Sequence, residues 1–257
     1  MKTPNLPSLA ASFFLFVGPA LAQAPEPPSA APGAGAASTP LVEILPRSPA
    51  VSPVEALARS GAWADLKVAA QQLLAEQAPT MKTDPAPVVA AFALLALANA
   101  GSGDPSGGIC RWQAAQILDP RLRQADLSAY GEPGRLLQAN PVQDNVSAHE
   151  TQKGTGSGAK AGKVQAPKVL HRRAPEMPPA ARRARVQGAV SVKAILAESG
   201  RVTQPRIVQA PPLGLGAATL DALCDWSFEP AVFEGKPVKV HYDLTMNFKL
   251  DQPVTEQ

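Results

Sequence analysis

The chain has 257 residues, of which 45% are hydrophobic and 18% are charged, and its formal net charge at pH 7 is +3. This composition is sufficient for a buried core, whereas 2 Cys and 3 His exclude a zinc-finger or disulfide-rich scaffold. The 28 Pro residues are about twice the usual share, which argues against one uninterrupted compact domain. No stretch of about 18 uninterrupted apolar residues exists, which excludes a transmembrane bundle.

The N-terminus has the pattern of a secretory signal peptide. Lys2 precedes a short apolar run from Leu9 to Val17, and Ala20-Leu21-Ala22 is a small-x-small cleavage site. We therefore expect residues 1–22 to be removed and the mature chain to be periplasmic. The alternative is an uncleaved signal that anchors the chain in the inner membrane.

Residues 23–53 contain eight Pro and seven Ala, a composition that predicts an extended linker. Residues 54–139 are rich in Ala and Leu, and they contain a weak repeat, since the segment 56–61 resembles the segment 96–101. The pattern is similar to tetratricopeptide-type helical hairpins, although a plain helical bundle explains it as well. The eleven-residue apolar run from Val88 to Ala98 is too short for a membrane span and predicts a buried helix.

Residues 140–168 form a second, Gly- and Lys-rich linker, followed by a mostly β segment at 169–251 and a tail at 252–257. The sequence thus predicts two small domains on two tethers. Cys110 and Cys224 either form one bridge between these domains or remain two separate thiols.

The second domain shows a strand–strand–helix–strand pattern. Apolar and polar residues alternate without a break over the thirteen residues 238–250, which predicts a long antiparallel strand with one buried and one wet face. Upstream, the segments 188–197 and 202–209 predict a hairpin that turns at Gly200, and the segment 217–226 predicts a short helix. The chain is therefore expected to be α+β, with an α-helical hairpin domain followed by a small antiparallel sheet of β-β-α-β order.

The motifs of this second domain resemble those of the TonB C-terminal domain family. The first half carries Pro175-Glu176-Met177-Pro178-Pro179-Ala180-Ala181-Arg182, then Gly188-Ala189-Val190-Ser191-Val192 and Gly200-Arg201-Val202. The second half carries Leu220-Asp221-Ala222-Leu223, Trp226-Ser227-Phe228-Glu229-Pro230-Ala231 and Gly235-Lys236-Pro237-Val238. The family usually has Tyr-Pro where this chain has Met177-Pro178. The resemblance covers about 80 of the 257 residues and none of the helical part.

Most of the motif residues have an architectural interpretation. Trp226 and Phe228 are expected to fill the core where helix meets sheet, Pro230 to end the helix, and Gly235 to turn the chain into the last strand. The same interpretation extends to the remaining motif positions, which are Pro178, Gly188, Gly200 and Leu220.

The resemblance implies that the domain binds an extended segment of an outer-membrane transporter by adding it as a strand to its sheet. The strand 238–250 is the candidate edge, and an inner strand is the alternative. The expected partner-binding residues are Val240, Tyr242, Asp243, Leu244 and Thr245.

The chain departs from the family at its N-terminus. An energy transducer of this type keeps a membrane helix that engages a proton-driven motor, whereas this chain carries a cleavable signal. We therefore expect a periplasmic TonB-like adaptor of the Gram-negative envelope that is related to energy transduction for outer-membrane transport. The alternative is a helical-repeat scaffold or assembly protein with no role in energy coupling.

Charge is unevenly distributed, since residues 153–206 have a net charge of +10 and the rest of the chain −7. This asymmetry indicates an anionic partner surface for the basic stretch, with a solvated linker and domain edge as the alternative. No nucleophile elbow or metal-ligand spacing is found, so the sequence predicts no enzyme, no cofactor and no metal. Nucleic acid and small-molecule substrates are not expected.

Overall fold

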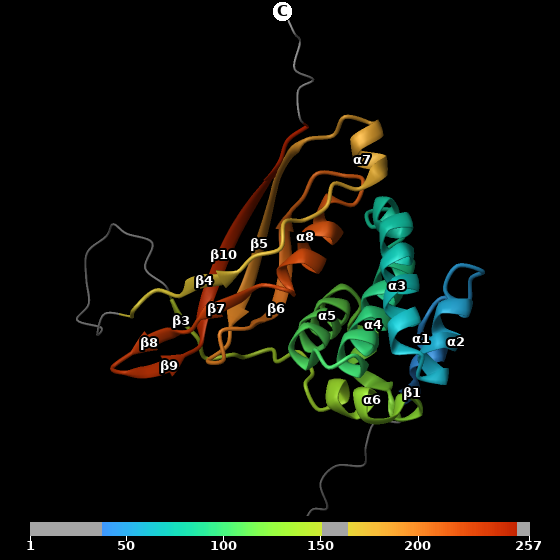
Figure 1. Cartoon of the computed structure of the whole chain (residues 1–257), viewed down its shortest axis with the longest axis horizontal. Helices are drawn as coiled ribbons and strands as arrows, with labels where there is room; N and C mark the ends of the chain where they lie inside the picture. The colour runs from blue at the N-terminus through green and yellow to red at the C-terminus, as the bar shows by residue number, and fades with distance from the viewer. Residues whose placement is uncertain (1–37, 151–163, 251–257) are drawn as a thin grey trace, which may run out of the picture. The chain divides into compact units, whose positions relative to one another are not determined.

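The computed structural model describes residues 38–150 and 164–250, all of which fall within one compact unit, Ala36–Gln257. Figure 1 shows helices in the first described range, followed by a twisted sheet with one helix on its face in the second. The predicted signal peptide, most of the first linker, the middle of the second linker and the tail lie outside the described residues.

The first range is almost entirely helical. Its long helices form two consecutive antiparallel pairs, α2 with α3 and α4 with α5, and α6 packs against α4 and α5. Their bounds are α1 Leu41–Ile44, α2 Ser52–Ser60, α3 Trp63–Gln77, η1 Ala78–Thr80, α4 Ala86–Gly101, α5 Pro105–Leu118, η2 Pro120–Gln124, η3 Ser128–Tyr130 and α6 Gly131–Gln138, with short strands β1 Thr39–Pro40 and β2 Ala125–Asp126.

Helix α4 is the centre of this packing. Every residue from Val88 to Ala98 is buried, so the helix is apolar on all sides, as expected of a core helix. Gly61 ends α2 in the left-handed conformation (φ +74°), which allows the sharp turn into α3. The prediction of a buried helix at this apolar run is confirmed. None of the described helices has the length and apolar character needed to cross a membrane.

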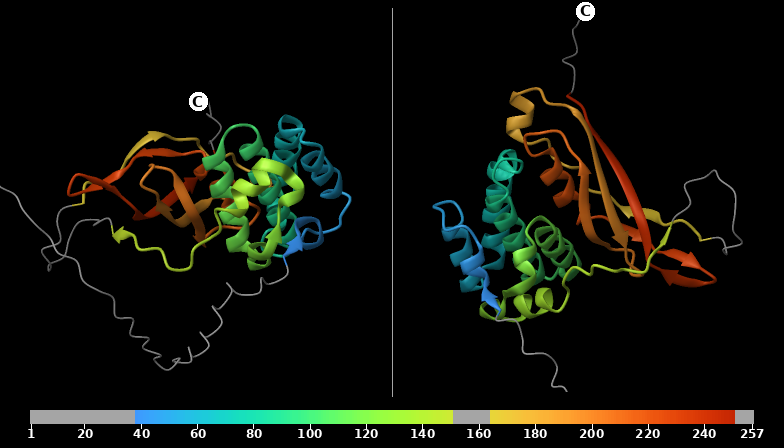
Figure 2. Two further views of the ribbon diagram at one scale, coloured as in Figure 1. Left: turned by 90° about the horizontal axis from the view of Figure 1, so that it is seen from below. Right: turned by 180° about the vertical axis from the view of Figure 1, so that it is seen from behind.

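The second range contains the sheet. Its main sheet has four strands in the order β3-β10-β5-β6, in which β5 pairs antiparallel with both β6 and β10 and β3 pairs parallel with β10 (Figure 2). The bounds are β3 His149–Glu150, β4 Lys168–His171, α7 Pro179–Arg183, β5 Gly188–Leu196, β6 Val202–Gln209, α8 Leu215–Leu223, β7 Ser227–Glu229, β8 Ala231–Phe233, β9 Lys236–Val238 and β10 Val240–Phe248. The predicted α+β class, with helices first and a small antiparallel sheet second, is confirmed.

The sheet buries the face that the alternation predicts. In β5 the buried side chains are those of Val190, Val192, Ala194 and Leu196. In β10 the polar residues His241, Asp243, Thr245 and Asn247 are all exposed. Their apolar neighbours face the core, because successive side chains of a strand point to opposite faces.

Gly200 forms the predicted turn between β5 and β6 with φ +73°. A Cβ atom at this position would lie only 1.9 Å from the carbonyl oxygen of Phe228. The Gly200 carbonyl oxygen in turn accepts a hydrogen bond from the Phe228 amide (2.9 Å). Gly200 is therefore required both by its positive φ and by the close approach of β7.

Three details of the predicted second domain are wrong. Helix α8 ends at Leu223, so Trp226 lies beyond it and Pro230 does not end it. Pro230 instead separates β7 from β8, where its missing N–H interrupts strand pairing. Gly235 (φ +78°) turns β8 into β9 rather than leading into the last strand, which begins at Val240.

Helices and sheet share one hydrophobic core, a single cluster of buried side chains whose first member along the chain is Leu41 and whose last is Phe248. Cys110 of α5 and Cys224, next to α8, form a disulfide across a sequence separation of 114 residues. The sequence left the pairing of these two residues open, and the structure pairs them. Part of the predicted second linker also packs on the helices, since Val142 is buried and its amide donates to Oε1 of Gln116 (2.8 Å).

Trp226 connects the sheet to the segment before α7. Its side chain is 2% exposed, its Nε1 donates to the carbonyl oxygen of Arg173 (2.8 Å), and the Arg172 guanidinium lies 4.9 Å from the ring centroid.

We expect Trp226→Ala to lower the free energy of unfolding by about 3–5 kcal/mol, because it leaves a large core cavity. The measurement is chemical denaturation, with the half-exposed Val169→Ala as a control that should change stability by less than about 0.5 kcal/mol. A loss below about 1 kcal/mol for Trp226→Ala would contradict its role in the core.

Candidate functional site: the outer edge of strand β10

Strand β10 has one long side that the described strands cover only at its first two residues. Its inner side pairs with β5 over the whole length, from Val240 opposite Leu196 to Phe248 opposite Gly188. On its outer side β3 pairs only with Val240 and His241. From Tyr242 to Phe248 the outer edge is therefore open within the described part of the chain.

The direction of the backbone groups along this edge follows from one hydrogen bond. The His149 amide donates to the carbonyl oxygen of Lys239 (2.8 Å), so the backbone groups of Lys239 point away from β5. Backbone groups alternate in direction along a strand, and the β10–β5 register has no shift between Val240 and Phe248. The amides of Asp243, Thr245 and Asn247 consequently point to the open edge, whereas those of Tyr242 and Leu244 point to β5.

The five residues expected from sequence to bind a partner are spread over different environments. Val240 is fully buried, and β3 already pairs with its outer side. Tyr242 and Leu244 are half-buried on the core face, where the Tyr242 ring meets Phe228 edge-on at 5.1 Å between centroids. Asp243 and Thr245 are exposed on the opposite face.

The motif residues, in contrast, lie mainly in the interior. Trp226, Phe228 and Leu220 are each at most 2% exposed. Pro178 is buried at the start of α7.

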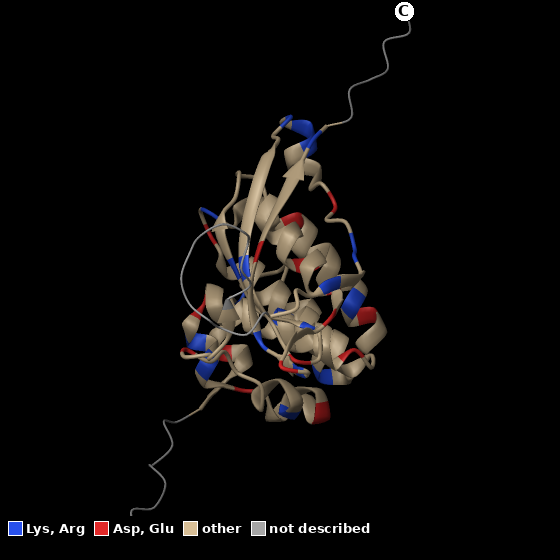
Figure 3. Cartoon of the chain, turned by 90° about the vertical axis from the view of Figure 1, so that its left-hand side faces the viewer, with Lys and Arg blue, Asp and Glu red and all other residues tan. Residues whose placement is uncertain are grey.

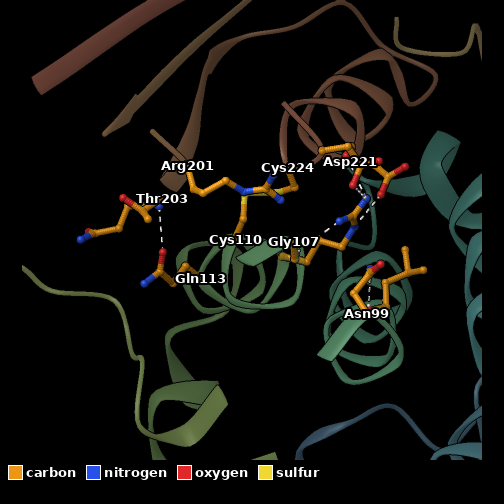
Figure 4. Close-up of a disulfide and its surroundings, with 12 residues drawn as sticks. Asn99, Gly107, Cys110, Gln113, Arg201, Thr203, Asp221 and Cys224 are labelled. Atoms are coloured by element: carbon orange, nitrogen blue, oxygen red, sulfur yellow. Dashed lines mark hydrogen bonds and ion pairs between the residues drawn. A yellow bond between two sulfur atoms is a disulfide. The ribbon is translucent and has the colours of Figure 1, made fainter. Parts of the chain in front are cut away.

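The other edge of the main sheet is closed by helix α5. Gln113 of α5 accepts a hydrogen bond from the backbone amide of Gln204 in β6 (3.0 Å). Figure 4 shows this bond as a dashed line between Gln113 and the backbone next to the labelled Thr203. The register between β5 and β6 also shifts here, and Gln204 has φ +49°. Pro205 follows and has no amide to donate. These features interrupt regular strand pairing in the first half of β6, whereas β10 is open from Tyr242 to Phe248 within the described residues.

Strand β3 is the part of this site that sequence reasoning missed. It lies in the segment interpreted as a linker, and its two residues are too short for a periodic signal. The His149 ring stacks on Phe233 of β8 at 5.1 Å between centroids, which holds the segment against the start of β10.

A buried ion-pair network fixes α5 against α8. The Arg111 side chain is 2% exposed, its Nε lies 2.8 Å from Oδ1 of Asp221, and its Nη2 lies 2.8 Å from Oδ1 of Asp225. Arg173 contacts both carboxylates from the other side, and its Nη1 lies 2.7 Å from Oδ2 of Asp225. Figure 4 shows Asp221 of this network close to the Cys110–Cys224 disulfide, so a covalent and an ionic connection join α5 to α8 and the turn after it.

Burial and the neighbouring arginines shift the pKa of Asp221 in opposite directions. Burial alone would raise the pKa of its carboxyl group, but the adjacent guanidinium groups of Arg111 and Arg173 hold the pKa below its ordinary value of 3.8. The ionised carboxylate is therefore the form that the folded chain favours.

Several cavities follow the boundary between helices and sheet. One of about 210 Å³ is lined by Leu74, Arg173, Met177 and Asp221, and one of about 260 Å³ by Gln113, Asn140 and Thr203 among others. A third, of about 440 Å³, lies between η1 and the end of β6. The described residues contain no group of three or more His, Cys, Asp or Glu side chains that could hold a metal ion.

The comparison with protein families places the site in a known domain. The family of the Gram-negative bacterial TonB protein C-terminal matches residues 173–250. This confirms the resemblance read from the motifs, and the TonB C-terminal domain is a protein-interaction domain that belongs to the cell envelope.

The search of solved structures gives a match to the solution NMR structure of the Pseudomonas aeruginosa TonB C-terminal domain. It has 25% sequence identity and a TM-score of 0.30, and it covers 34% of this chain and 88% of that chain. No curated protein matches the chain.

The depressed pKa of Asp221 predicts how stability depends on pH. Because the folded-state pKa lies below the unfolded value, the ionised carboxylate stabilises the fold above about pH 4, and this contribution is lost as the pH falls through the folded pKa. Asp221→Asn should lower the free energy of unfolding by about 3 kcal/mol at pH 7, since the buried Arg111 loses a partner, and by less at pH 2–3, below the unfolded pKa. Denaturant titrations at both pH values measure this. The exposed Asp243→Asn is the control and should be near neutral, whereas an equal loss at both pH values for Asp221→Asn would contradict the assignment.

Proposed function

We propose that this protein is a periplasmic adaptor that binds an extended segment of another envelope protein by adding it as a strand to β10. The observation that carries the proposal is the outer edge from Tyr242 to Phe248, which no strand of the described residues covers. The outward amides of Asp243, Thr245 and Asn247, together with their carbonyl groups, supply a ladder for a partner strand. Selectivity comes from the side chains of the partner that fall beside Tyr242 and Leu244 on one face and beside Asp243 and Thr245 on the other.

The partner proposed is an outer-membrane transporter, which is the partner class that the TonB C-terminal domain implies. The segment proposed to pair with the partner begins at Tyr242 and not, as expected from the sequence, at Val240, because β3 pairs with the outer side of Val240 and His241. The disulfide supports residence in the periplasm, since disulfides persist in oxidising compartments.

Proline substitutions test the strand-addition proposal. Asp243→Pro removes an amide that points to the open edge, so the full chain should keep its fold while peptide binding falls at least tenfold. Tyr242→Pro removes an amide that bonds to β5 and should destabilise the fold, because Pro is tolerated chiefly at sheet edges. The probe is an array of overlapping peptides from the periplasmic segments of the outer-membrane transporters of the same cell. Affinities of the binding peptides are then measured by calorimetric titration, and folding by circular dichroism.

Asp243→Ala is the matched control, since it keeps the amide and should weaken binding only modestly. Unaltered peptide binding by a folded Asp243→Pro variant would refute the use of this edge. Peptide binding that maps to the helices between residues 54 and 139 would instead favour the scaffold function.

The periplasmic assignment predicts a new N-terminus at Gln23. Cleavage after Ala22 should release the chain into the osmotic-shock fraction, and N-terminal sequencing of the recovered protein measures it. An intact N-terminus in carbonate-washed inner membranes would contradict cleavage and favour an anchored energy transducer.

A further inference from the structure

A group of basic side chains gathers at one end of the sheet. Helix α7 carries Arg182 and Arg183 in its last turn, Arg185 follows with φ +54°, and Lys249 follows β10. These four residues are termed the basic tip. In Figure 3, the ribbon is blue for Lys and Arg at the end of the sheet where α7 and the end of β10 meet.

Two contacts hold these segments together. Phe248 at the end of β10 pairs with Gly188 at the start of β5, three residues after Arg185. The Leu250 amide donates to Oε1 of Gln187 (3.1 Å). The end of β10 is therefore fixed beside the segment that follows α7, which places Lys249 near the arginines.

The charge of the basic tip is not compensated within the described residues. All four side chains are exposed, and the structure gives none of them an ion pair there. The sequence has no Asp or Glu between Glu176 and Glu198, and Asp251 lies outside the described residues. Arg182 and Arg183 complement the α7 dipole, but Arg185 and Lys249 lie outside that helix, so helix capping does not account for the group.

The surroundings of the tip distinguish between anionic partners. A protein interface needs an apolar core within its polar rim. The exposed large hydrophobic residues are Val68, Val169, Leu170 and Val208, and none of them belongs to α7, to the segment 184–188 or to the end of β10. The three cavities described above are lined by none of the four cations, so none of these cavities brings the tip residues around a discrete anion.

We infer that the basic tip docks on the phosphate groups of an anionic phospholipid surface. Such a surface presents many phosphates in one plane and requires no pocket and no apolar anchor. Each Lys or Arg near it contributes about 1 kcal/mol of attraction. Arginine suits this role because its planar guanidinium group donates two parallel hydrogen bonds to phosphate. This activity goes beyond strand addition at β10 and does not depend on it.

Vesicle binding tests the inference. The full chain is mixed with vesicles of phosphatidylcholine, with and without phosphatidylglycerol, and its vesicle-bound fraction is measured by flotation. The double variant Arg182→Glu with Arg183→Glu is compared with Arg47→Glu with Lys236→Glu, which reverses two exposed cations elsewhere that also lack an ion pair among the described residues. Both variants change the net charge equally and keep the same N-terminal segment, and circular dichroism verifies their folds.

The wild-type chain should bind the phosphatidylglycerol vesicles, and moderate salt should weaken the binding. The tip variant should bind roughly 30-fold more weakly, and the control variant should stay within about threefold of the wild type. Equal losses in both variants would refute the inference, because net charge alone would then explain binding. Equal binding to vesicles without phosphatidylglycerol would refute it too. Tip-dependent binding to poly-glutamate but not to vesicles would overturn it in favour of an acidic peptide.

Discussion

The buried guanidinium group of Arg111 determines how the helices lie against the sheet. A charge that is 2% exposed is stable only with partners, and its partners Asp221 and Asp225 come from α8 and the turn after it, more than a hundred residues away. Removal of a carboxylate partner would leave this charge buried and incompletely paired, at a cost of about 3–5 kcal/mol. The adjacent disulfide closes a loop of 114 residues, which the chain-entropy description values at about 4–5 kcal/mol. The helices are therefore part of the folding unit of the sheet.

The fixed position of α5 has a consequence for the sheet edges. A small sheet normally exposes unpaired backbone groups at both edges, and each edge invites pairing with other chains. Here Gln113 of α5 bonds the Gln204 amide, and Pro205 removes the next donor, so β6 offers no regular ladder. Among the described residues, the edge of β10 has no such cover from Tyr242 onward. The helical part thus contributes to the difference between the two edges, in addition to stabilising the core.

Sequence reasoning succeeded where a local pattern is long and failed where the decisive contact is distant. The alternation around β10, the β5–β6 hairpin with Gly200 and the buried run of α4 are regular enough to predict their elements. The interpretation of Pro230 failed because a proline ends helices and interrupts strands equally, and only the observed end of α8 at Leu223 distinguishes them. The pairing of Arg111 with Asp221, the Cys110–Cys224 disulfide and the two-residue strand β3 have no periodic signal. They result from tertiary packing between segments that composition had separated into two domains.

The open edge of β10 also bears on how copies of this chain can pair with each other. Head-to-tail pairing of two different edges builds rings or open filaments. Pairing of β10 with β10 of a second copy would instead be a self-complementary contact that closes as a dimer. That contact would occupy the same amides of Asp243, Thr245 and Asn247 that a partner strand needs. Self-association through β10 and binding of a partner strand would therefore compete for the same backbone groups.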